Sequence, residues 1–352
     1  MANTSPPRRG PMQGILIADF VEDPAEIWPV ELPRPHRHPD EYLIRVTHVS
    51  PQHADILHAN GKHQNVSKKG HIRPPFILGY SFAGVVEEVE TTPSTHKPFR
   101  KGDRVFGSHI GAFAEQVCVR PEHIRRIPDS IDSASACAMT GQLVSYAAVK
   151  HIAKVKPGET VLVSGASGGL GYGCCAVAKA LGAKVIALTS SEEKAALMKS
   201  NDDIDHVVVT TGNWTNQVLA HTSGHGVEAV FDNIGMVNDA LTCLGYEGRI
   251  VVLGFAARNG VMEEVKMNRI LLKSASVVGL RFGQFSRRFP ERFREVSRGF
   301  EEFVLSGKYK PRLYGKYHGF EDIVQALRDL ADQKVYGKIV VSLDSPETKA
   351  KL

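Results

Sequence analysis

The amino-acid sequence predicts an α/β fold with two parts, a β-rich domain and a parallel α/β domain, and three observations support this prediction. The chain has 352 residues, and at roughly 100 to 200 residues per domain it has room for two domains. Short strand-like runs separated by turn residues occupy the first third of the sequence. From about Ser130 onward, strand-like runs alternate with helix-like segments, which is typical of a parallel sheet.

The β-rich domain is expected over residues 14–130. Its predicted strands lie at 14–18, 42–46, 83–86, 104–106 and 114–119, and turn residues separate them. This spacing favours a small β-barrel. Residues 1–13 precede the barrel, and their prolines and arginines predict a mobile N-terminal segment.

The parallel α/β domain is expected over residues 131–284. Apolar runs too short for helices lie at 160–163, 184–188, 227–231 and 249–253, and a helix-prone segment at 172–181 separates the first two. Beyond Gln284 the charged residues return, followed by a predicted helix at 320–332 and a final strand at 338–341. We expect residues 285–352 to return to the β-rich domain and to complete it.

Composition argues against several classes of protein. The net charge is +5, an excess too small to predict nucleic-acid binding. No run approaches the roughly 20 apolar residues of a membrane helix, and the first residues lack the apolar region of a signal peptide. The five cysteines are an odd number, and the adjacent Cys174 and Cys175 cannot easily bridge each other. We therefore expect a soluble intracellular protein with free thiols and no membrane or nucleic-acid partner.

A glycine-rich loop lies between the first two predicted strands of the α/β domain. Its residues are Ala166, Ser167, Gly168, Gly169, Leu170 and Gly171. Compared with the pattern G-x-G-x-x-G, the loop keeps the second and third glycines and has alanine at the first. Gly168 would let the backbone approach a pyrophosphate, and Gly171 would let the following helix, whose N-terminus favours phosphate, pack against the strand. The loop predicts a dinucleotide site, and a glycine turn selected for packing alone is the alternative.

The residues after the second α/β strand predict which nicotinamide cofactor binds. A carboxylate there accepts a hydrogen bond from the ribose 2′-OH and repels a 2′-phosphate, but this chain has Ser190. Lys194 lies four residues later, where the first turn of a helix would direct both side chains to one phosphate. This favours NADPH, although Glu192 and Glu193 weaken the electrostatic argument. The alternative is a capping box of Ser190 and Glu193, which is compatible with phosphate binding.

Several separated stretches of the chain resemble one known family. They are residues 75–79, 82–86, 102–105, 111–115, 252–256, 271–273, 276–279 and 337–340. Together with the glycine loop, they resemble the zinc-independent medium-chain dehydrogenase/reductases, in particular the quinone oxidoreductase-like and enoyl reductase branch. The resemblance extends from about Gly14 to Leu343, and it is more specific for the superfamily than for a substrate.

The resemblance implies a GroES-like β-barrel catalytic domain built from both ends of the chain, with a doubly wound Rossmann cofactor domain inserted between them. It also implies cofactor contacts outside the glycine loop, namely Asn233 near the ribose, Gly254 and Phe255 along the cofactor, Phe282 beside the nicotinamide and Lys338 at the phosphates. Relatives commonly form homodimers through the edge of the cofactor-domain sheet, which here corresponds to residues 275–280.

The resemblance also provides a test for zinc. Zinc alcohol dehydrogenases have a cysteine three residues before an aspartate and a His-Glu pair after the glycine of a Leu-Gly turn. Here Gln52 precedes Asp55, and Gly79 is followed by Tyr80 and Ser81. Neither glutamine nor tyrosine completes a credible zinc site. The alternative, a metal bound by the seven histidines between residues 36 and 71, lacks an H-E-x-x-H or C-x-x-C motif, so we expect no metal.

Without zinc as a Lewis acid, conjugate reduction is favoured over reversible alcohol oxidation. NADPH would deliver hydride to the β-carbon of a quinone or an α,β-unsaturated ketone, and the enolate would need hydrogen-bond donors and a proton. In related enoyl-thioester reductases a tyrosine eight residues after the aspartate donates this proton, and His63 occupies that position here. A solvent-facing loop histidine is the alternative. Gln52, where relatives often have asparagine, is expected to orient the substrate.

Two other functions stay open at this point. One is reduction of an enoyl thioester, either an enoyl-CoA or a polyketide intermediate. The other is a non-catalytic protein that binds NADPH and a partner, because a fold does not guarantee an activity.

Two further segments bear on partners and location. The stretch Arg281–Arg288 interleaves arginine with phenylalanine; a solvated helix start is the favoured interpretation, and nucleic-acid or coenzyme A binding is the alternative. The chain ends in Ala350-Lys351-Leu352, a close variant of the Ser-Lys-Leu address. In a eukaryote this ending predicts the peroxisome, and the cytoplasm is the alternative.

Overall fold

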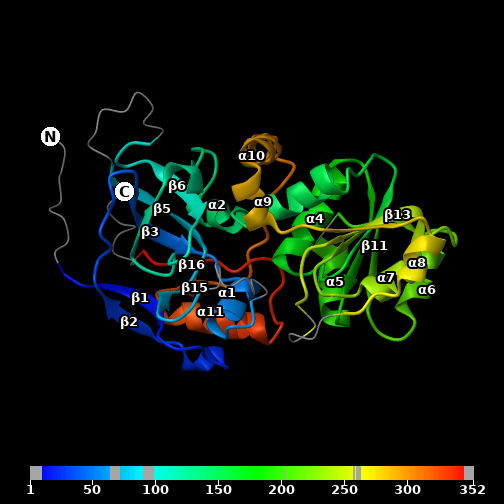
Figure 1. Cartoon of the computed structure of the whole chain (residues 1–352), viewed down its shortest axis with the longest axis horizontal. Coiled ribbons are helices and arrows are strands. Elements are labelled where there is room, and N and C mark those ends of the chain that lie inside the picture. Colours follow the sequence, from blue (N-terminus) through cyan, green and yellow to red (C-terminus); the bar gives the residue numbers. More distant parts are fainter. Residues whose placement is uncertain are drawn as a thin grey trace. The chain divides into compact units, whose positions relative to one another are not determined.

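The computed structural model describes residues 10–63, 72–89, 99–201, 203–256, 258 and 263–344 (Figure 1). The chain forms two compact units. The first comprises Met1–Thr140, Leu313–Lys334 and Ile339–Leu352, and the second comprises Gly141–Arg312 and Val335–Lys338. Of the expected mobile segment 1–13, residues 1–9 lie outside the described residues, whereas Met12 and Gln13 already belong to the first strand.

The chain passes from the first unit to the second after Thr140 and returns to the first unit at Leu313. Both points lie later in the chain than the boundaries at residues 131 and 285 that the sequence predicts. Helix α2 (Ser133–Met139) packs on the sheet of the first unit, and the guanidinium of Arg104 donates to the Ile131 carbonyl at 2.7 Å just before it. Helix α10 (Pro290–Leu305) belongs to the second unit, where the ring of Phe300 lies 5.8 Å from that of Tyr146. Side-chain packing therefore sets these boundaries later than the change of sequence pattern.

The first unit is rich in β-structure, as the sequence predicts. One sheet has the order β2-β1-β4, and a larger one has the order β15-β16-β3-β5-β6-β8, in which β7 also pairs with β3. Its elements are β1 (Met12–Ile17), η1 (Pro24–Glu26), β2 (Pro29–Leu32), β3 (Tyr42–Val49), α1 (His53–Ala59), β4 (Phe76–Ile77), β5 (Ser81–Glu88), β6 (Arg104–Ser108), β7 (Gln116–Val119), η2 (Pro121–His123), β8 (Ile124–Arg126), α2, β15 (Tyr317–His318), α11 (Glu321–Ala331) and β16 (Val341–Ser342). Strands β5 and β3 approach so closely that a Cβ added to Gly84 would lie 2.2 Å from the Arg45 carbonyl oxygen.

The C-terminal part of the chain returns to the first unit only in pieces. Helix α11 and strands β15 and β16 belong to it, and β16 pairs with β3 through Val341 and Val49. The expected strand at 338–341 is wrong in its first residues, because β16 begins only at Val341. Residues 335–338 belong to the second unit, where Gly337 forms a bridge with Gly168.

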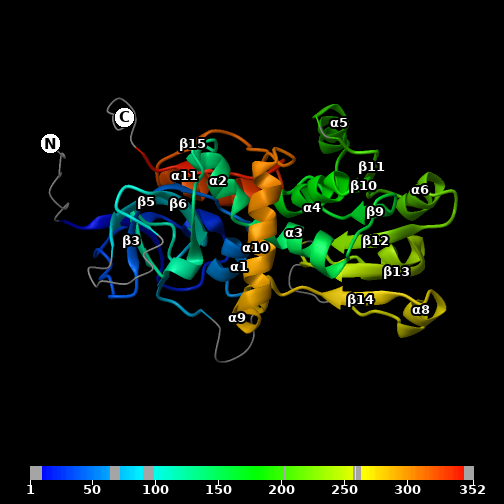
Figure 2. The same ribbon diagram turned by 90° about the horizontal axis from the view of Figure 1, so that it is seen from above.

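The second unit is built on six parallel strands in the order β11-β10-β9-β12-β13-β14, which Figure 2 shows in sequence across the sheet. Its elements are α3 (Gln142–Tyr146), η3 (Ala147–Ile152), β9 (Thr160–Val163), α4 (Gly169–Ala180), β10 (Lys184–Thr189), α5 (Glu192–Asn201), β11 (His206–Val209), α6 (Trp214–His221), β12 (Val227–Asp232), α7 (Val237–Cys243), β13 (Leu244–Val252), α8 (Met267–Leu272), β14 (Ser276–Gly279), α9 (Phe282–Arg288) and α10. The strand order reverses beside β9, and in such sheets ligands bind at the carboxyl ends of the strands at this point. The predicted fold class is confirmed.

The middle strands of this sheet are short apolar runs because helices cover them. Val161, Leu162 and Val163 of β9 are fully buried, as expected for a parallel sheet with both faces covered. Helices α6 and α7 contribute Val218 and Leu241 to the core beneath the sheet. The buried strands at the centre of this unit lead, at their carboxyl ends, into the loops for which the sequence predicts a function.

In the part of the chain that the structure describes, no helix combines the length and the apolar character needed to span a bilayer. All five cysteines are free.

Candidate functional site

The glycine loop connects β9 to α4 and is held in a tight turn. Gly165 has a φ of +57°, which glycine adopts without strain, and the amide of Ala166 donates to the Leu188 carbonyl of β10 at 3.0 Å. A Cβ added to Gly171 would lie 2.3 Å from the Gly165 carbonyl oxygen and 2.7 Å from the Ala166 Cα. Helix α4 therefore lies so close to the loop that only glycine fits at this position.

The start of α4 has no side-chain cap. The N-cap residue is Gly168, which has no side chain to accept from the amides of the first turn. The first amides of a helix have no partner within the helix, and together with the helix dipole they form a site that favours anions. A Cβ on Gly168 would meet only the Gly165 carbonyl oxygen, at 3.5 Å. The fold itself thus leaves room above Gly168, in contrast to Gly171.

Two polar side chains from α3, which sequence analysis missed, hold the first turn of α4 in place. The Gln142 amide donates to the Gly169 carbonyl at 2.9 Å, and the Ser145 hydroxyl donates to the Leu170 carbonyl at 2.8 Å. Both side chains are buried. Their signal in the sequence is weak, since it consists of two polar residues three apart in an otherwise apolar helix. By binding the carbonyls of the turn, they leave its amides for another partner.

Lys338 lies against the same turn. The amide of Gly337 donates to the Ser167 carbonyl at 2.8 Å, which fixes the segment before β16 alongside the loop. A Cβ on Gly169 would lie 2.2 Å from Cδ of Lys338, so the lysine side chain passes directly over Gly169. Lys338 is only 8% exposed. A buried lysine beside an uncapped helix start places a positive charge where an anion would sit.

The helix cap that follows β10 differs by one residue from the predicted capping box. The residue that caps α5 is Ser191, whose hydroxyl accepts from the Lys194 amide at 3.2 Å. The expected box of Ser190 and Glu193 is therefore wrong by one residue, because α5 begins at Glu192 and Lys194 occupies the third helical position. Ser190 is exposed. Burial lowers the pKa of Lys194, and the nearby Glu193 acts in the opposite direction.

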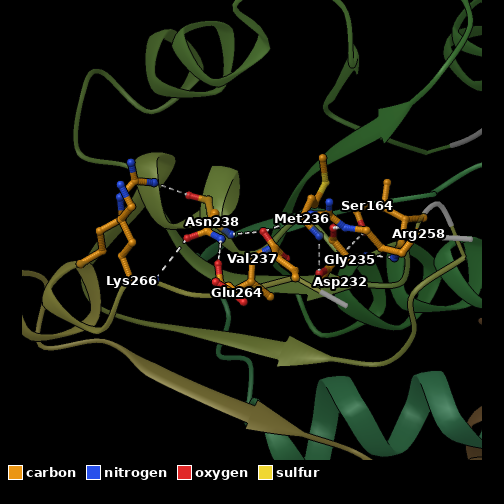
Figure 3. A network of polar contacts seen from close by, with 12 residues as sticks. Ser164, Asp232, Gly235, Met236, Val237, Asn238, Arg258, Glu264 and Lys266 are labelled. Atoms are coloured by element: carbon orange, nitrogen blue, oxygen red, sulfur yellow. Dashed lines mark hydrogen bonds and ion pairs between the residues drawn. The ribbon is translucent and has the colours of Figure 1, made fainter. Parts of the chain in front are cut away.

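A buried carboxylate organises the loop after β12 (Figure 3). Asp232 accepts from the amides of Gly235 at 3.1 Å and Met236 at 2.8 Å. It also accepts from the Ser164 hydroxyl at 2.8 Å, which ties it to the end of β9. Burial raises the pKa of Asp232, and its hydrogen bonds partly oppose this. Asp232 thus couples the loops after two neighbouring strands.

Asn233 and the loop after β13 lie beside this carboxylate. The Asn233 side-chain amide donates to the Ser164 carbonyl at 2.7 Å, and its buried Oδ1 has no hydrogen-bond partner among the described residues. The Gly254 amide donates to the Asp232 carbonyl at 3.2 Å, and a Cβ on Gly254 would lie 2.9 Å from the Asn233 carbonyl oxygen. Phe255 follows next, within contact distance of the Gly235 position. The structure therefore brings Asn233, Gly254 and Phe255 together, and their contacts with a cofactor stay a prediction.

Phe282 occupies a separate place in the second unit. It is the first residue of α9, shortly after β14 ends at Gly279. Its ring lies 5.9 Å from that of Phe285 and 5.7 Å from that of Phe293. These ring contacts pack Phe282 within its own helix pair, so its role beside the nicotinamide stays a prediction.

In the first unit, Gln52 and His63 lie at the two ends of α1. The Gln52 amide donates to the Ser81 hydroxyl at 3.2 Å. The ring of His63 stacks on that of His58 at 4.0 Å, and His58 lies 5.2 Å from the ring of Tyr80. Because Tyr80 and Ser81 are neighbours, Gln52 and the stacked histidines converge on the same short segment. Sequence analysis assigned His58 no role beyond its place among the seven histidines between residues 36 and 71, and the structure buries it against the ring of His63.

Two family profiles match the chain. The one described as an alcohol dehydrogenase GroES-like domain matches residues 38–150, and the one described as a zinc-binding dehydrogenase matches residues 169–300. Quinone oxidoreductase-like protein 2 of Bos taurus is 33% identical over 320 residues, which cover 88% of this chain and 87% of the relative. The chain belongs to the quinone oxidoreductase-like family of medium-chain dehydrogenase/reductases.

Solved structures and a further relative of this medium-chain dehydrogenase/reductase agree with the assignment. A probable oxidoreductase from Mycobacterium abscessus is 32% identical with a TM-score of 0.82, over 96% of this chain and all of the other. A mycobacterial protein complexed with NADPH is 27% identical with a TM-score of 0.84, over 94% of this chain and 100% of the other. An acryloyl-coenzyme A reductase from Sulfurisphaera tokodaii is 28% identical, over 88% of this chain and 95% of the relative.

One of the matching profiles is named for zinc, yet the side chains of this medium-chain dehydrogenase/reductase do not fit that ion. The positions at which zinc alcohol dehydrogenases have ligands carry Gln52, Tyr80 and Ser81, and the Gln52 amide nitrogen is already directed at the Ser81 hydroxyl. Zinc prefers thiolate, imidazole and carboxylate ligands. Within the described ranges, no three His, Cys, Asp or Glu side chains group closely enough to hold a metal. The residues at these positions are therefore better suited to hydrogen bonding than to zinc coordination.

Replacing Gly171 with alanine should lower the free energy of unfolding by about 1–3 kcal/mol, because the new Cβ forces loop backbone away from α4. Chemical denaturation of the Gly171→Ala variant measures this loss. The matched control is Gly283→Ala in α9, where an added Cβ meets nothing within 4 Å. The control should be neutral or more stable by up to about 1 kcal/mol, since alanine favours a helix. Equal stabilities of both variants and the wild type would contradict the close approach.

Proposed function

We propose that this protein is an NADPH-dependent reductase that transfers hydride to the β-carbon of a quinone or an α,β-unsaturated ketone. The observation that carries the proposal is the start of α4, where uncapped amides lie beside the side chain of Lys338. A phosphate group is the ligand that suits such a site. The mycobacterial relative complexed with NADPH supports a nicotinamide cofactor.

The residues of the second unit would bind the cofactor along the carboxyl edge of the sheet. The amides of Leu170 and Gly171 and the ammonium of Lys338 would hold the pyrophosphate, for which the space above Gly168 is suited. Ser190 and Lys194 would bind the 2′-phosphate. Asn233 would donate or accept at the ribose, with Gly254 and Phe255 along the nicotinamide half. NADPH supplies the hydride when it is bound.

The residues of the first unit would act on the substrate. Gln52 would orient the substrate carbonyl through its amide, whose position the Ser81 hydroxyl fixes. His63 would donate a proton to the α-carbon after hydride reaches the β-carbon, so that one hydride and one proton together saturate the double bond. Stacking on the buried His58 would hold the His63 ring in one orientation.

A second candidate is reduction of an enoyl thioester, which the similarity to an acryloyl-coenzyme A reductase favours. The rates of NADPH oxidation with a small quinone and with crotonyl-CoA, measured side by side, rank the two reactions. Tight NADPH binding without turnover on any quinone, enone or thioester would instead support a non-catalytic NADPH-binding protein.

The cellular location stays a prediction. Residues Ala350, Lys351 and Leu352 lie outside the described residues. In a eukaryotic source the proposed location is the peroxisome, and the cytoplasm is the alternative.

The Lys194→Ala variant should raise the KM for NADPH about tenfold or more, because a charge-assisted hydrogen bond to the 2′-phosphate contributes about 1.5–3 kcal/mol. The KM for NADH should remain unchanged, since NADH has no phosphate there. Steady-state kinetics with both cofactors make the measurement. Lys199→Ala is the control, because Lys199 is exposed on the same helix. Equal losses with NADPH and NADH would overturn the choice of cofactor.

The His63→Phe variant should lose about 100-fold or more of its turnover with an enone, while NADPH binding is retained. Phenylalanine keeps the stacking on His58 but cannot donate a proton. Turnover and cofactor fluorescence are measured in parallel, with the exposed His318→Phe as control. Unchanged turnover in His63→Phe would remove His63 from the mechanism.

The proposal includes a homodimer formed through β14. This strand is at the edge of the six-stranded sheet, and all four of its residues are exposed. Val277 and Val278 are 37% and 41% exposed, and the neighbouring helix α8 exposes Leu271 and Leu272 to 78% and 74%. Exposed apolar side chains beside an open strand edge are typical of an interface with a second strand.

Replacing Val277 and Val278 with lysine should convert the dimer to a monomer, because like charges would face each other across the paired edges. Light scattering after size-exclusion chromatography gives the mass. Leu305→Lys, at a residue 58% exposed on α10, is the control and should leave the dimer intact. A wild-type protein that is already monomeric at micromolar concentration would contradict the homodimer.

A further inference from the structure

The segment from Arg281 to Arg298 concentrates most of the net charge of the protein. It contains six arginines and two glutamates, a net charge of +4, whereas the whole chain carries +5. All six arginines are exposed. The segment covers α9 and the first half of α10, which Figure 2 shows as consecutive helices after β14. A positive field of this density favours a ligand with several negative charges.

Aromatic rings lie among these arginines. Phe282 and Phe293 hold α9 against α10 at 5.7 Å, and the ring of Phe285 lies 5.9 Å from that of Phe289. Phe289, at the junction of the two helices, remains 47% exposed. The guanidinium of Arg292 lies 5.3 Å from the Phe285 ring and 5.5 Å from the Phe289 ring. An exposed phenylalanine beside a stacked guanidinium is a surface on which a planar base can stack.

The arginines around Phe289 are not neutralised by carboxylates. Arg294 pairs with Glu291 at 3.0 Å, but among the described residues Arg287, Arg288 and Arg292 have no ion-pair partner. We call Arg287, Arg288, Phe289 and Arg292 the basic platform. A solvated helix start, the interpretation favoured from sequence, explains the exposed charges but not the exposed ring among them.

The helical segment that carries the basic platform starts from the carboxyl edge of the sheet, the edge that also carries the proposed cofactor site. The Leu280 amide donates to the Val252 carbonyl at 3.1 Å, so the chain leaves β14 beside the end of β13. Helix α9 begins two residues later. This edge is where parallel sheets of this type bind ligands.

We propose that the basic platform binds the adenosine 3′-phosphate 5′-diphosphate end of a coenzyme A thioester. The proposal rests on the proposed reductase activity and favours its second candidate substrate, an enoyl thioester, over a quinone or an enone. The adenine stacks on Phe289 and the Arg292 guanidinium. The phosphate groups of coenzyme A accept from the guanidinium groups of Arg287 and Arg288, whose planar donors suit phosphate oxygens.

The size of the platform favours this ligand over a nucleic acid. A nucleic-acid groove requires a track of cations that follows several successive phosphates. Here the charge is confined to one short helical segment, and the remainder of the chain contributes a net charge of only +1. One nucleotide with its phosphates matches the exposed ring and the three guanidinium groups of the platform.

The test compares two substrates that share the reacting acyl group. Crotonyl-CoA carries the nucleotide, and the N-acetylcysteamine thioester of crotonate lacks it. The Arg287→Ala/Arg288→Ala double variant should raise the KM for crotonyl-CoA about tenfold or more, with kcat and the KM for the truncated thioester unchanged. Arg294→Ala is the matched control, because Arg294 lies in the same segment but pairs with Glu291. Equal changes with both thioesters would overturn the proposal.

A binding measurement separates this site from the cofactor site and needs no turnover. With NADPH saturating, titration calorimetry with adenosine 3′,5′-bisphosphate should show binding to the wild-type protein and to Arg294→Ala. The double variant and Phe289→Ser should bind at least several-fold more weakly. Equal binding by all four proteins would overturn the proposal, as would tighter binding of a single-stranded oligonucleotide that the same substitutions weaken.

The outcomes distinguish this inference from the proposed function. Absence of NADPH oxidation with every quinone, enone and thioester would refute the reductase, whereas the calorimetric result would still test the platform. Turnover of the truncated thioester with no advantage for crotonyl-CoA would refute the platform alone.

Discussion

The close approach of α4 to the loop after β9 is the constraint on which the rest of the second unit depends. At Gly171 the helix lies against loop backbone, so the contact is between main chains and leaves no room for a side chain. Main-chain contacts cannot adjust by changing rotamer, which fixes the direction of the helix and of its first amides. Gln142 and Ser145 then hold the carbonyls of that turn from the other side. Contacts within the chain therefore fix the backbone of this turn.

Asp232 likewise fixes backbone at the carboxyl ends of two neighbouring strands, β9 and β12. A buried carboxylate is costly to desolvate, and hydrogen bonds from the Ser164 hydroxyl and the amides after β12 offset that cost. Glu263, in the segment between β13 and α8, accepts from the Val237 and Asn238 amides at 2.8 Å each and pairs with Arg258 at 3.2 Å. Carboxylates therefore fix the backbone of the loop that carries Asn233. The direction of the Asn233 side chain follows from this buried network and from its own bond to the Ser164 carbonyl.

The fold class was predictable because it depends on local patterns. Apolar runs such as 160–163 are too short for helices, and a glycine loop between strand and helix indicates a nucleotide-binding turn without knowledge of the remainder of the chain. The caps and boundaries were less predictable. Ser190 and Ser191 are equally good caps, and only the observed start of α5 decides between them. The position of Lys338 over Gly169 joins segments far apart in the sequence, and no local pattern contains that information.

The second unit carries two kinds of positive charge, single half-buried or buried lysines and a group of exposed arginines. Lys338 and Lys194 are partly or fully buried single charges, and burial already lowers the pKa of Lys194. A phosphate beside Lys194 would favour its charged form and so oppose the effect of burial on its pKa. The arginines of the basic platform are exposed to solvent. They attract a polyanion over a longer range but with less discrimination, and salt screens them more strongly. In the proposed reductase, Lys194 and Lys338 would select a phosphorylated nicotinamide cofactor at close range, whereas the exposed arginines would increase the rate at which a coenzyme A thioester is captured.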